Sequence, residues 1–125
     1  MTIEAIANTT QDVANDFTAL LKAGQFDEAG ETWWADSVVS LEPIGEGAVT
    51  RGIAAVRIKG EQWSHAHEIH AIEVGGPYVH GDQFALRFTM DVTQRASGER
   101  MQMDEIGVYT VRSGKIVEER FFYGG

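Results

Sequence analysis

The carboxyl group of Glu42 is the first candidate for chemistry in this sequence. A β-branched segment leads into Glu42 and Pro43 follows it, so a strand has to end beside this acid, because proline cannot continue a sheet. The neighbouring Leu41 and Ile44 predict that the carboxyl is partly desolvated. Desolvation would raise its pKa and make it a proton acceptor or donor near neutral pH. The alternative is a strand end that faces solvent.

A second acid is expected to face inward from a later hairpin. Between residues 84 and 92 the even positions are apolar, so that face lines the interior. A two-residue turn at Ser97-Gly98 sets Met90 opposite Glu105, which then points inward, whereas a three-residue turn would bring Asp104 inward instead. We predict the first register, which also sets Phe88 opposite Gly107.

Glu42 and Glu105 in one apolar cup would form an acid/base pair whose surroundings separate their pKa values. The alternative for Glu105 is a salt bridge to a nearby arginine. The remaining candidate residues are mostly aromatic and would line a pocket for a small apolar molecule: Phe17, Trp34, Trp63, His67, Phe88, Met90, Gly107, Tyr109, Phe121 and Tyr123.

The histidines give a weaker signal. If His65 and His67 lay on one strand, both imidazoles would share a face, but metal binding needs further ligands at fixed geometry, and their spacing is wrong here. The sequence therefore predicts no metal and no organic cofactor. His67 and His70 have opposite parity, so one of them should face the cavity, and either could instead be a satisfied core histidine.

The elements that must position these residues follow from hydrophobic periodicity. Three helices are predicted: an amphipathic one that runs from Ile3 or begins at a capping box of Thr9 and Asp12, a short one over 26–34 that buries Phe26, and one capped by Thr50. In the third, an apolar stripe that ends at Trp63 opposes a polar face containing Lys59. One strand, 38–42, precedes it, and strands at 67–74, 84–92, 101–111 and 116–123 follow as an antiparallel meander, with turns at 75–77, 97–98 and 113–114.

This order predicts a single α+β domain over residues 1–125: a conical barrel of strongly curved, mainly antiparallel sheet with its helices on the concave side. The net charge of −9 and the lack of a basic cluster argue against nucleic acid and anionic membranes as partners. No cysteine is present, no apolar run approaches the roughly 20 residues that span a bilayer, and the start lacks the features of a signal peptide. We expect a cytoplasmic protein.

Five segments together resemble the SnoaL-like and ketosteroid-isomerase-like branch of the nuclear-transport-factor-2-like superfamily: FTALLKAG at 17–24, WAD at 34–36, LEPIG at 41–45, GIAAVR at 52–57 and SGKIV at 113–117. The resemblance implies a homodimer that pairs across the convex face of the sheet. It places Glu42 where the isomerases have a proton-shuttling aspartate. It places Phe17 and Gly107 where they have a tyrosine and a protonated aspartate that stabilise the oxyanion, so both donors are replaced here. Their loss argues against steroid isomerisation.

These observations favour an enzyme that transfers protons on a small apolar cyclic or carbonyl compound, as an isomerase, cyclase or dehydratase. Two other classes stay open: a ligand-binding module without chemistry, and a dimeric assembly domain. The superfamily hosts all three, so the fold cannot separate them.

Overall fold

A computed structural model describes residues 8–45 and 48–124. The elements follow one another as α1 (Thr10–Lys22), α2 (Phe26–Trp33), β1 (Trp34–Leu41), β2 (Val49–Arg51), α3 (Ile53–Ala66), β3 (His67–His80), β4 (Gln83–Gln94), β5 (Arg100–Arg112) and β6 (Lys115–Phe122). Within this part of the chain, no helix has the length and apolar character that crossing a membrane requires.

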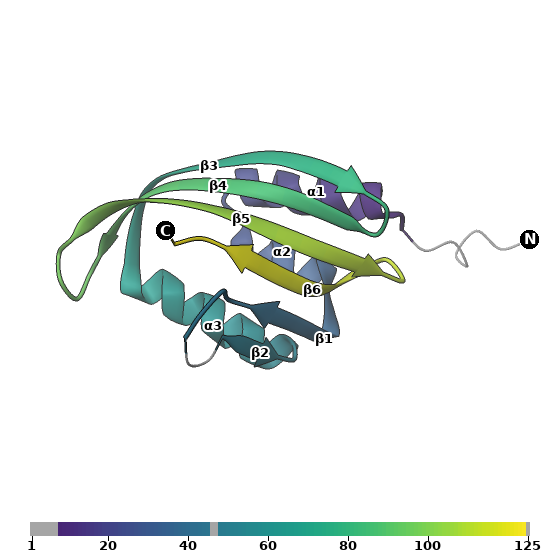
Figure 1. The fold of residues 1–125 in the computed structure, drawn as a ribbon, viewed down its shortest axis with the longest axis horizontal. Helices are drawn as coiled ribbons and strands as arrows, with labels where there is room; N and C mark the ends of the chain where they lie inside the picture. The colour runs from purple at the N-terminus through teal and green to yellow at the C-terminus, as the bar shows by residue number, and fades with distance from the viewer. Residues whose placement is uncertain (1–7, 46–47, 125) are drawn as a thin grey trace, which may run out of the picture.

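The six strands form one sheet in the order β2-β1-β6-β5-β4-β3. All neighbours pair antiparallel except β1 and β6, which are parallel. In Figure 1 the long strands β3, β4 and β5 curve together, with α1 behind them and α3 beside β1 and β2. The predicted α+β class and curved sheet are confirmed, and the sheet remains an open cone because β2 and β3 do not pair with each other.

Helix α1 begins at the later of the two predicted starts, and the earlier one near Ile3 lies outside the described residues. The Thr9 side chain accepts a hydrogen bond from the Asp12 backbone amide, and the Asp12 side chain accepts one from the Thr9 amide, which makes a capping box. One face of α1 then buries Val13, Phe17 and Leu21 against the sheet. Phe17 lies in contact with Tyr109, their ring centroids being 5.1 Å apart. The helix therefore covers the concave side of the sheet, mainly over β3, and reaches β5 through Phe17.

The β4–β5 hairpin has the predicted parity with a different register. Phe88 lies opposite Glu105, and Leu86, rather than Phe88, lies opposite Gly107. The predicted two-residue turn is wrong, because the chain turns over residues 95–98, with Gly98 at φ +72° and its amide bonded to the Gln94 carbonyl. The longer loop shifts the pairing by two residues. Since side chains alternate with a period of two, that shift leaves the same residues facing inward.

Several expected boundaries are also wrong. Thr50 does not cap α3: it pairs with Ser40 within β2, and Gly52 precedes the helix. The glycines and proline at 75–77 do not end a strand but form a one-residue bulge inside β3, which continues to His80. Phe26, expected in the core, is 38% exposed at the start of α2.

Candidate functional site

Glu42 lies in an ion pair rather than in the apolar surroundings that the sequence predicted. It follows β1, where Lys59 of α3 donates a hydrogen bond of 2.6 Å to its Oε2. The Tyr123 hydroxyl donates one of 2.7 Å to its Oε1. Each oxygen of Glu42 thus already accepts a strong hydrogen bond, and its side chain is 21% exposed. This arrangement stabilises a carboxylate in one fixed position.

A buried acid that the sequence reading did not single out anchors the other side of Lys59. The Lys59 ammonium also donates to Ser40 Oγ at 2.7 Å, and Ser40 donates to Glu119 Oε2 at 2.8 Å. The Trp34 indole donates to the other oxygen of Glu119 at 3.1 Å. Glu119 is only 6% exposed, and burial raises its pKa, partly opposed by these donors and by the Lys59 charge. A continuous polar chain therefore runs from Trp34 to Tyr123.

Glu105 faces the same chain from β5. Burial raises its pKa to about 7, and the nearby charge of Glu42 raises it further while that of Lys59 lowers it. No hydrogen bond within residues 8–45 and 48–124 contributes to that pKa. A carboxyl group with a pKa near 7 can both accept and return a proton at neutral pH. Glu105 is thus the acid of this cluster that is ready to exchange protons.

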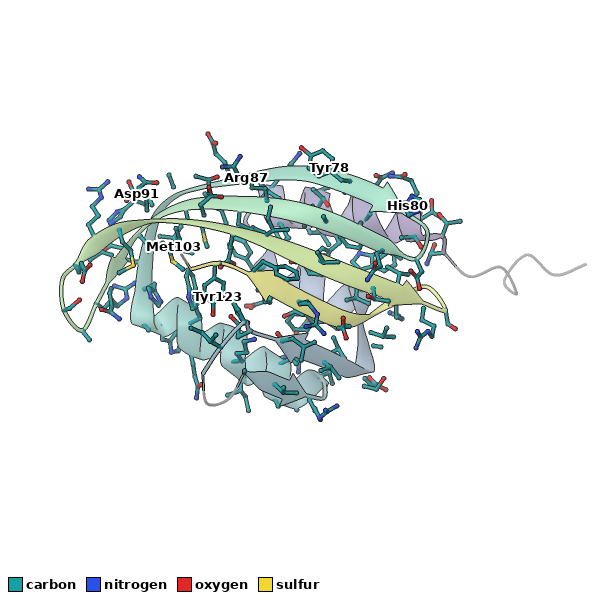
Figure 2. The ribbon with its side chains drawn as sticks, in the orientation of Figure 1. Tyr78, His80, Arg87, Asp91, Met103 and Tyr123 are labelled. Atoms are coloured by element: carbon teal, nitrogen blue, oxygen red, sulfur yellow. The ribbon has the colours of Figure 1, made fainter. Side chains whose placement is uncertain are left out.

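The pairing of β5 with β6 explains why these groups gather. Successive inward positions of β5 are Glu105, Gly107 and Tyr109. On β6, Phe121 lies opposite Gly107 and Glu119 lies opposite Tyr109. The opposite parity carries charges on the outer face, where Asp104 forms a two-bonded pair with Arg87. Asp104 therefore points away from the cluster, and Figure 2 shows Arg87 on the outer side of the sheet and Tyr123 on the side of α3.

The aromatic candidates fall into two groups. Phe17 and Tyr109 are buried in the core together with Phe88 and Met90. Phe121 is partly buried, and its ring lies 5.5 Å from the Lys59 ammonium, a cation–π distance. Trp34 packs over Gly30, where an added Cβ would meet the indole at 2.6 Å. Tyr123 is 41% exposed, so it is the most accessible of these aromatic candidates.

His67 and Trp63 contact each other as a pair. Their rings stack with centroids 4.4 Å apart, and His67 Nδ1 lies 2.9 Å from the Trp63 carbonyl. His70 is exposed and bonds Thr93, so His67 is the more enclosed of the two. His65 belongs to α3 while His67 begins β3, so the idea of two imidazoles on one strand face is wrong. Among the residues with described positions, no group of three or more His, Asp or Glu side chains could hold a metal ion.

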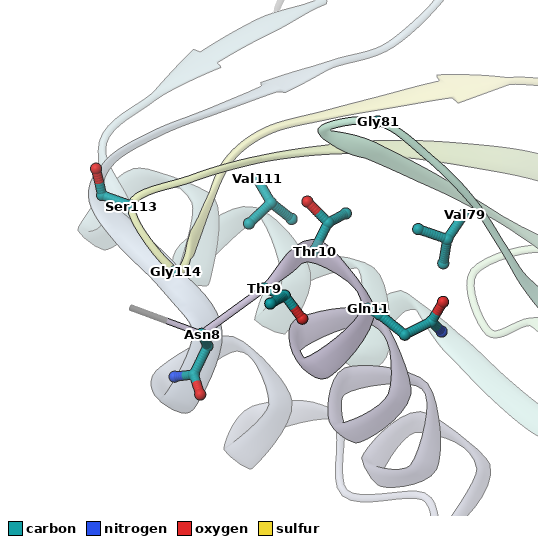
Figure 3. Close-up of a pocket in the computed structure, with 9 residues that line it drawn as sticks. All are labelled: Asn8, Thr9, Thr10, Gln11, Val79, Gly81, Val111, Ser113 and Gly114. Atoms are coloured by element: carbon teal, nitrogen blue, oxygen red, sulfur yellow. The ribbon is translucent and has the colours of Figure 1, made fainter. Parts of the chain in front are cut away.

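Two hollows of the described surface lie away from the acids. One of about 470 Å³ lies at the start of α1, between Thr9, Thr10, Val111 and the Ser113-Gly114 turn (Figure 3). The other, about 560 Å³, lies at the β3 edge beside Lys22, Tyr78 and Arg87. Neither is lined by Glu42 or Glu105. A hollow at the acid cluster therefore stays a prediction.

Lys59, Ser40 and Glu119 also belong to the site, although the sequence did not single them out. Lys59 was assigned to the polar face of its helix, since nothing local shows that this face turns toward β1. Glu119 sits in the charged run Glu118-Glu119-Arg120, and only its parity with Phe121 and Tyr123 could have indicated that it faces inward. Ser40, near the end of β1, lies two residues before Glu42, so alternation could likewise have indicated that the two side chains share a face.

The model of the SnoaL-like domain matches residues 8–123. The chain belongs to the SnoaL-like family. A protein from Mesorhizobium loti with a known crystal structure is 52% identical to this SnoaL-like chain. It carries two provisional names, SnoaL-like polyketide cyclase and carbohydrate phosphatase. The match covers 93% of this chain and 100% of that one, with a TM-score of 0.90.

More distant structures share the fold of this SnoaL-like chain. A provisionally named polyketide cyclase from Pseudomonas putida is 19% identical over 94% of this chain and 93% of its own, with a TM-score of 0.70. A nuclear-transport-factor-2-like protein from Burkholderia xenovorans is 19% identical over 92% of this chain and 88% of its own, with a TM-score of 0.75. No curated protein matches the sequence.

Proposed function

We propose that this SnoaL-like protein transfers a proton on a small, largely apolar compound that carries a carbonyl group, as an isomerase, cyclase or dehydratase. The observation that carries the proposal is the Glu105 carboxyl, whose pKa of about 7 arises inside a cluster of otherwise hydrogen-bonded charges. Proton transfer at carbon is slow in water, and a positioned carboxylate typically accelerates it about 10²- to 10⁴-fold.

Glu105, rather than Glu42, is the proton carrier in this proposal. Both oxygens of Glu42 are engaged by Lys59 and Tyr123, so its lone pairs are directed toward the protein. Ionised Glu105 takes a proton from the carbon beside the carbonyl, and the C–H electron pair becomes the C=C bond of an enol or enolate. Protonated Glu105 then returns the proton to another carbon, or to a leaving hydroxyl. The carboxyl ends as it began, so no further reactant is consumed.

The other charged groups of the cluster support this role of Glu105. Glu42, Glu105 and Glu119 gather around the single ammonium of Lys59, so full ionisation of all three would leave an excess of two negative charges in a half-buried space. Such a cluster retains a proton near neutrality. Glu105 is the member of the three with no described donor, so the proton is expected to reside there. The name of the Mesorhizobium relative supports a cyclase class for the reaction.

The test is deuterium exchange at carbons beside the carbonyl group, followed by NMR, with cyclohexanone, indanone and acetophenone in heavy water. We expect wild-type protein to accelerate exchange of at least one ketone and Glu105→Gln to abolish it. Asp104→Asn is the matched control, because Asp104 is the adjacent residue on the outer face. Exchange that is equal in wild type and Glu105→Gln would contradict the proposal.

A second candidate is a ligand-binding module without chemistry. The observation that favours it is the set of bonds that already occupies Glu42 together with the Trp34 indole packed into the cluster. A binder would show saturable binding of a ketone with no acceleration of exchange. The same samples therefore distinguish the two candidates.

A further inference from the structure

Tyr109 fills the space that Gly107 leaves open. A Cβ atom built on Gly107 would lie 2.9 Å from the Tyr109 hydroxyl and 3.1 Å from a ring carbon. The φ angle of Gly107 does not lie in the left-handed region, so its backbone does not require glycine. Glycine inside a strand weakens it and often marks a close approach. The missing side chain therefore has a spatial reason, which is to admit the phenol.

The direction of the Tyr109 side chain follows from this contact. Residues 105, 107 and 109 share the inner face of β5, and same-face neighbours lie roughly 6.6 Å apart along a strand. The Tyr109 hydroxyl lies above Gly107, so the ring leans along the strand toward Glu105. The rings of Phe84, at 4.9 Å, and Phe17, at 5.1 Å, hold it in this orientation. The phenol oxygen thus lies on the inner face of β5, on the side of Tyr109 that faces Glu105.

The Tyr109 hydroxyl is an available hydrogen-bond donor on this inner face of β5. Among the described residues it makes no hydrogen bond, whereas the other hydroxyls near the cluster, those of Tyr123 and Ser40, are bonded. Tyr109 is 2% exposed, so its unbonded hydroxyl is almost completely enclosed by protein. A buried phenol without a partner loses about 1–3 kcal/mol relative to a bonded one, which a bound ligand oxygen would restore.

The protonation state of the phenol is also fixed. Burial, followed by the negative charges of Glu119 and Glu105, raises the pKa of Tyr109 well above 10, so its proton stays in place at any working pH. Phe121 lies between the Tyr109 phenol and the Lys59 ammonium: its ring centroid is 6.3 Å from the Tyr109 ring and 5.5 Å from Lys59 Nζ.

We infer that the Tyr109 hydroxyl donates a hydrogen bond to the carbonyl oxygen of the substrate and stabilises the oxyanion that forms when Glu105 removes a proton. The inference rests on the proposed function and assigns it a second catalytic residue. Phe17 and Gly107, which the resemblance set at the positions of the missing donors, both contact this phenol. One tyrosine from β5 therefore occupies the region where two donors were expected. The substrate class it selects is a neutral ketone or enone, because the surrounding carboxylates repel an anion.

The experiment measures the carbonyl stretch of bound acetophenone by infrared difference spectroscopy. Donation by Tyr109 lowers this frequency in wild type relative to Tyr109→Phe, which keeps the ring. Gly107→Ala should remove the same shift while retaining the hydroxyl, since the added Cβ displaces it. Tyr78→Phe, at a residue 67% exposed, is the control and should keep the shift.

Exchange kinetics give the second readout. Loss of one oxyanion donor costs about 10²- to 10³-fold in kcat, so Tyr109→Phe should slow deuterium exchange by that factor with a small change in KM. An identical carbonyl frequency in wild type and Tyr109→Phe, or no binding of acetophenone at all, would overturn the inference. Exchange that depends on Glu105 but not on Tyr109 would overturn it while leaving the proposed function intact. A frequency shift without exchange would support the donor and contradict the proposed proton transfer.

Discussion

Replacing Glu105 with glutamine should make the protein more stable above neutral pH while removing its activity. Glutamine has nearly the same shape and cannot ionise. In wild type the Glu105 pKa is raised from 4.5 to about 7, mainly by burial, so ionising this carboxyl in the native state is unfavourable. Between these two values the native state keeps a proton that the unfolded chain has released. The free energy of unfolding of wild type therefore falls as pH rises from about 4.5 to about 7.

The magnitude follows from the same pKa change. A change of about 2.5 in pKa corresponds to about 3.4 kcal/mol, at 1.36 kcal/mol for each factor of ten. Because Glu105 is only partly enclosed, solvent screening reduces this to about 2 kcal/mol. For a chain of this length, that corresponds to an increase in Tm of about 8 °C for Glu105→Gln at pH 8.

The assay is urea unfolding of wild type, Glu105→Gln and Asp104→Asn between pH 4.5 and 8. We expect the stability difference between wild type and Glu105→Gln to grow with pH up to about 7 and then to level off. Asp104→Asn breaks the outer pair with Arg87 and should not show this pH dependence. A difference between wild type and Glu105→Gln that is the same at pH 5 and pH 8 would refute the reasoning.

Three further predictions concern the parts that support the site. Lys59→Met removes the cation that lowers the pKa of Glu105, so side-chain carboxyl NMR should find that pKa above 7; an unchanged value would show that Lys59 does not act on Glu105. Thr9→Ala removes the capping box of α1 and should lower the free energy of unfolding by about 1 kcal/mol in urea, and the cap has no role in stability if nothing changes. The predicted dimer would use the outer face, where Phe122 lies opposite Ile106 and is 50% exposed. In sedimentation we expect wild type to be a dimer and Phe122→Glu to be a monomer. A monomeric wild type would contradict the predicted dimer.

Local signals were sufficient for much of the architecture. The alternation of β4, the capping box at Thr9 and the turn at Ser113-Gly114 each depend on neighbouring residues, and each appears in the structure at the predicted place. The inward orientation of Glu105 also followed from alternation, which survived an error of two residues in the register.

The environment of each acid could not be predicted in this way. Glu42 was expected beside apolar residues because its sequence neighbours are apolar, whereas its spatial neighbours are Lys59, seventeen residues later, and Tyr123, eighty-one residues later. Which face of α3 turns toward β1 depends on how the whole chain packs, since Lys59 lies on the face that the sequence reads as polar. The same dependence on packing hid the place of Glu119 beneath Ser40.

The titration of the Glu105 side-chain carboxyl by NMR tests the central claim most directly, with Glu105→Gln used to assign the resonance. We expect a pKa of about 7 for Glu105 in the folded protein. A value near 4.5 would contradict it, because Glu105 would then be an ordinary ionised acid and the protein would lack its proposed proton carrier.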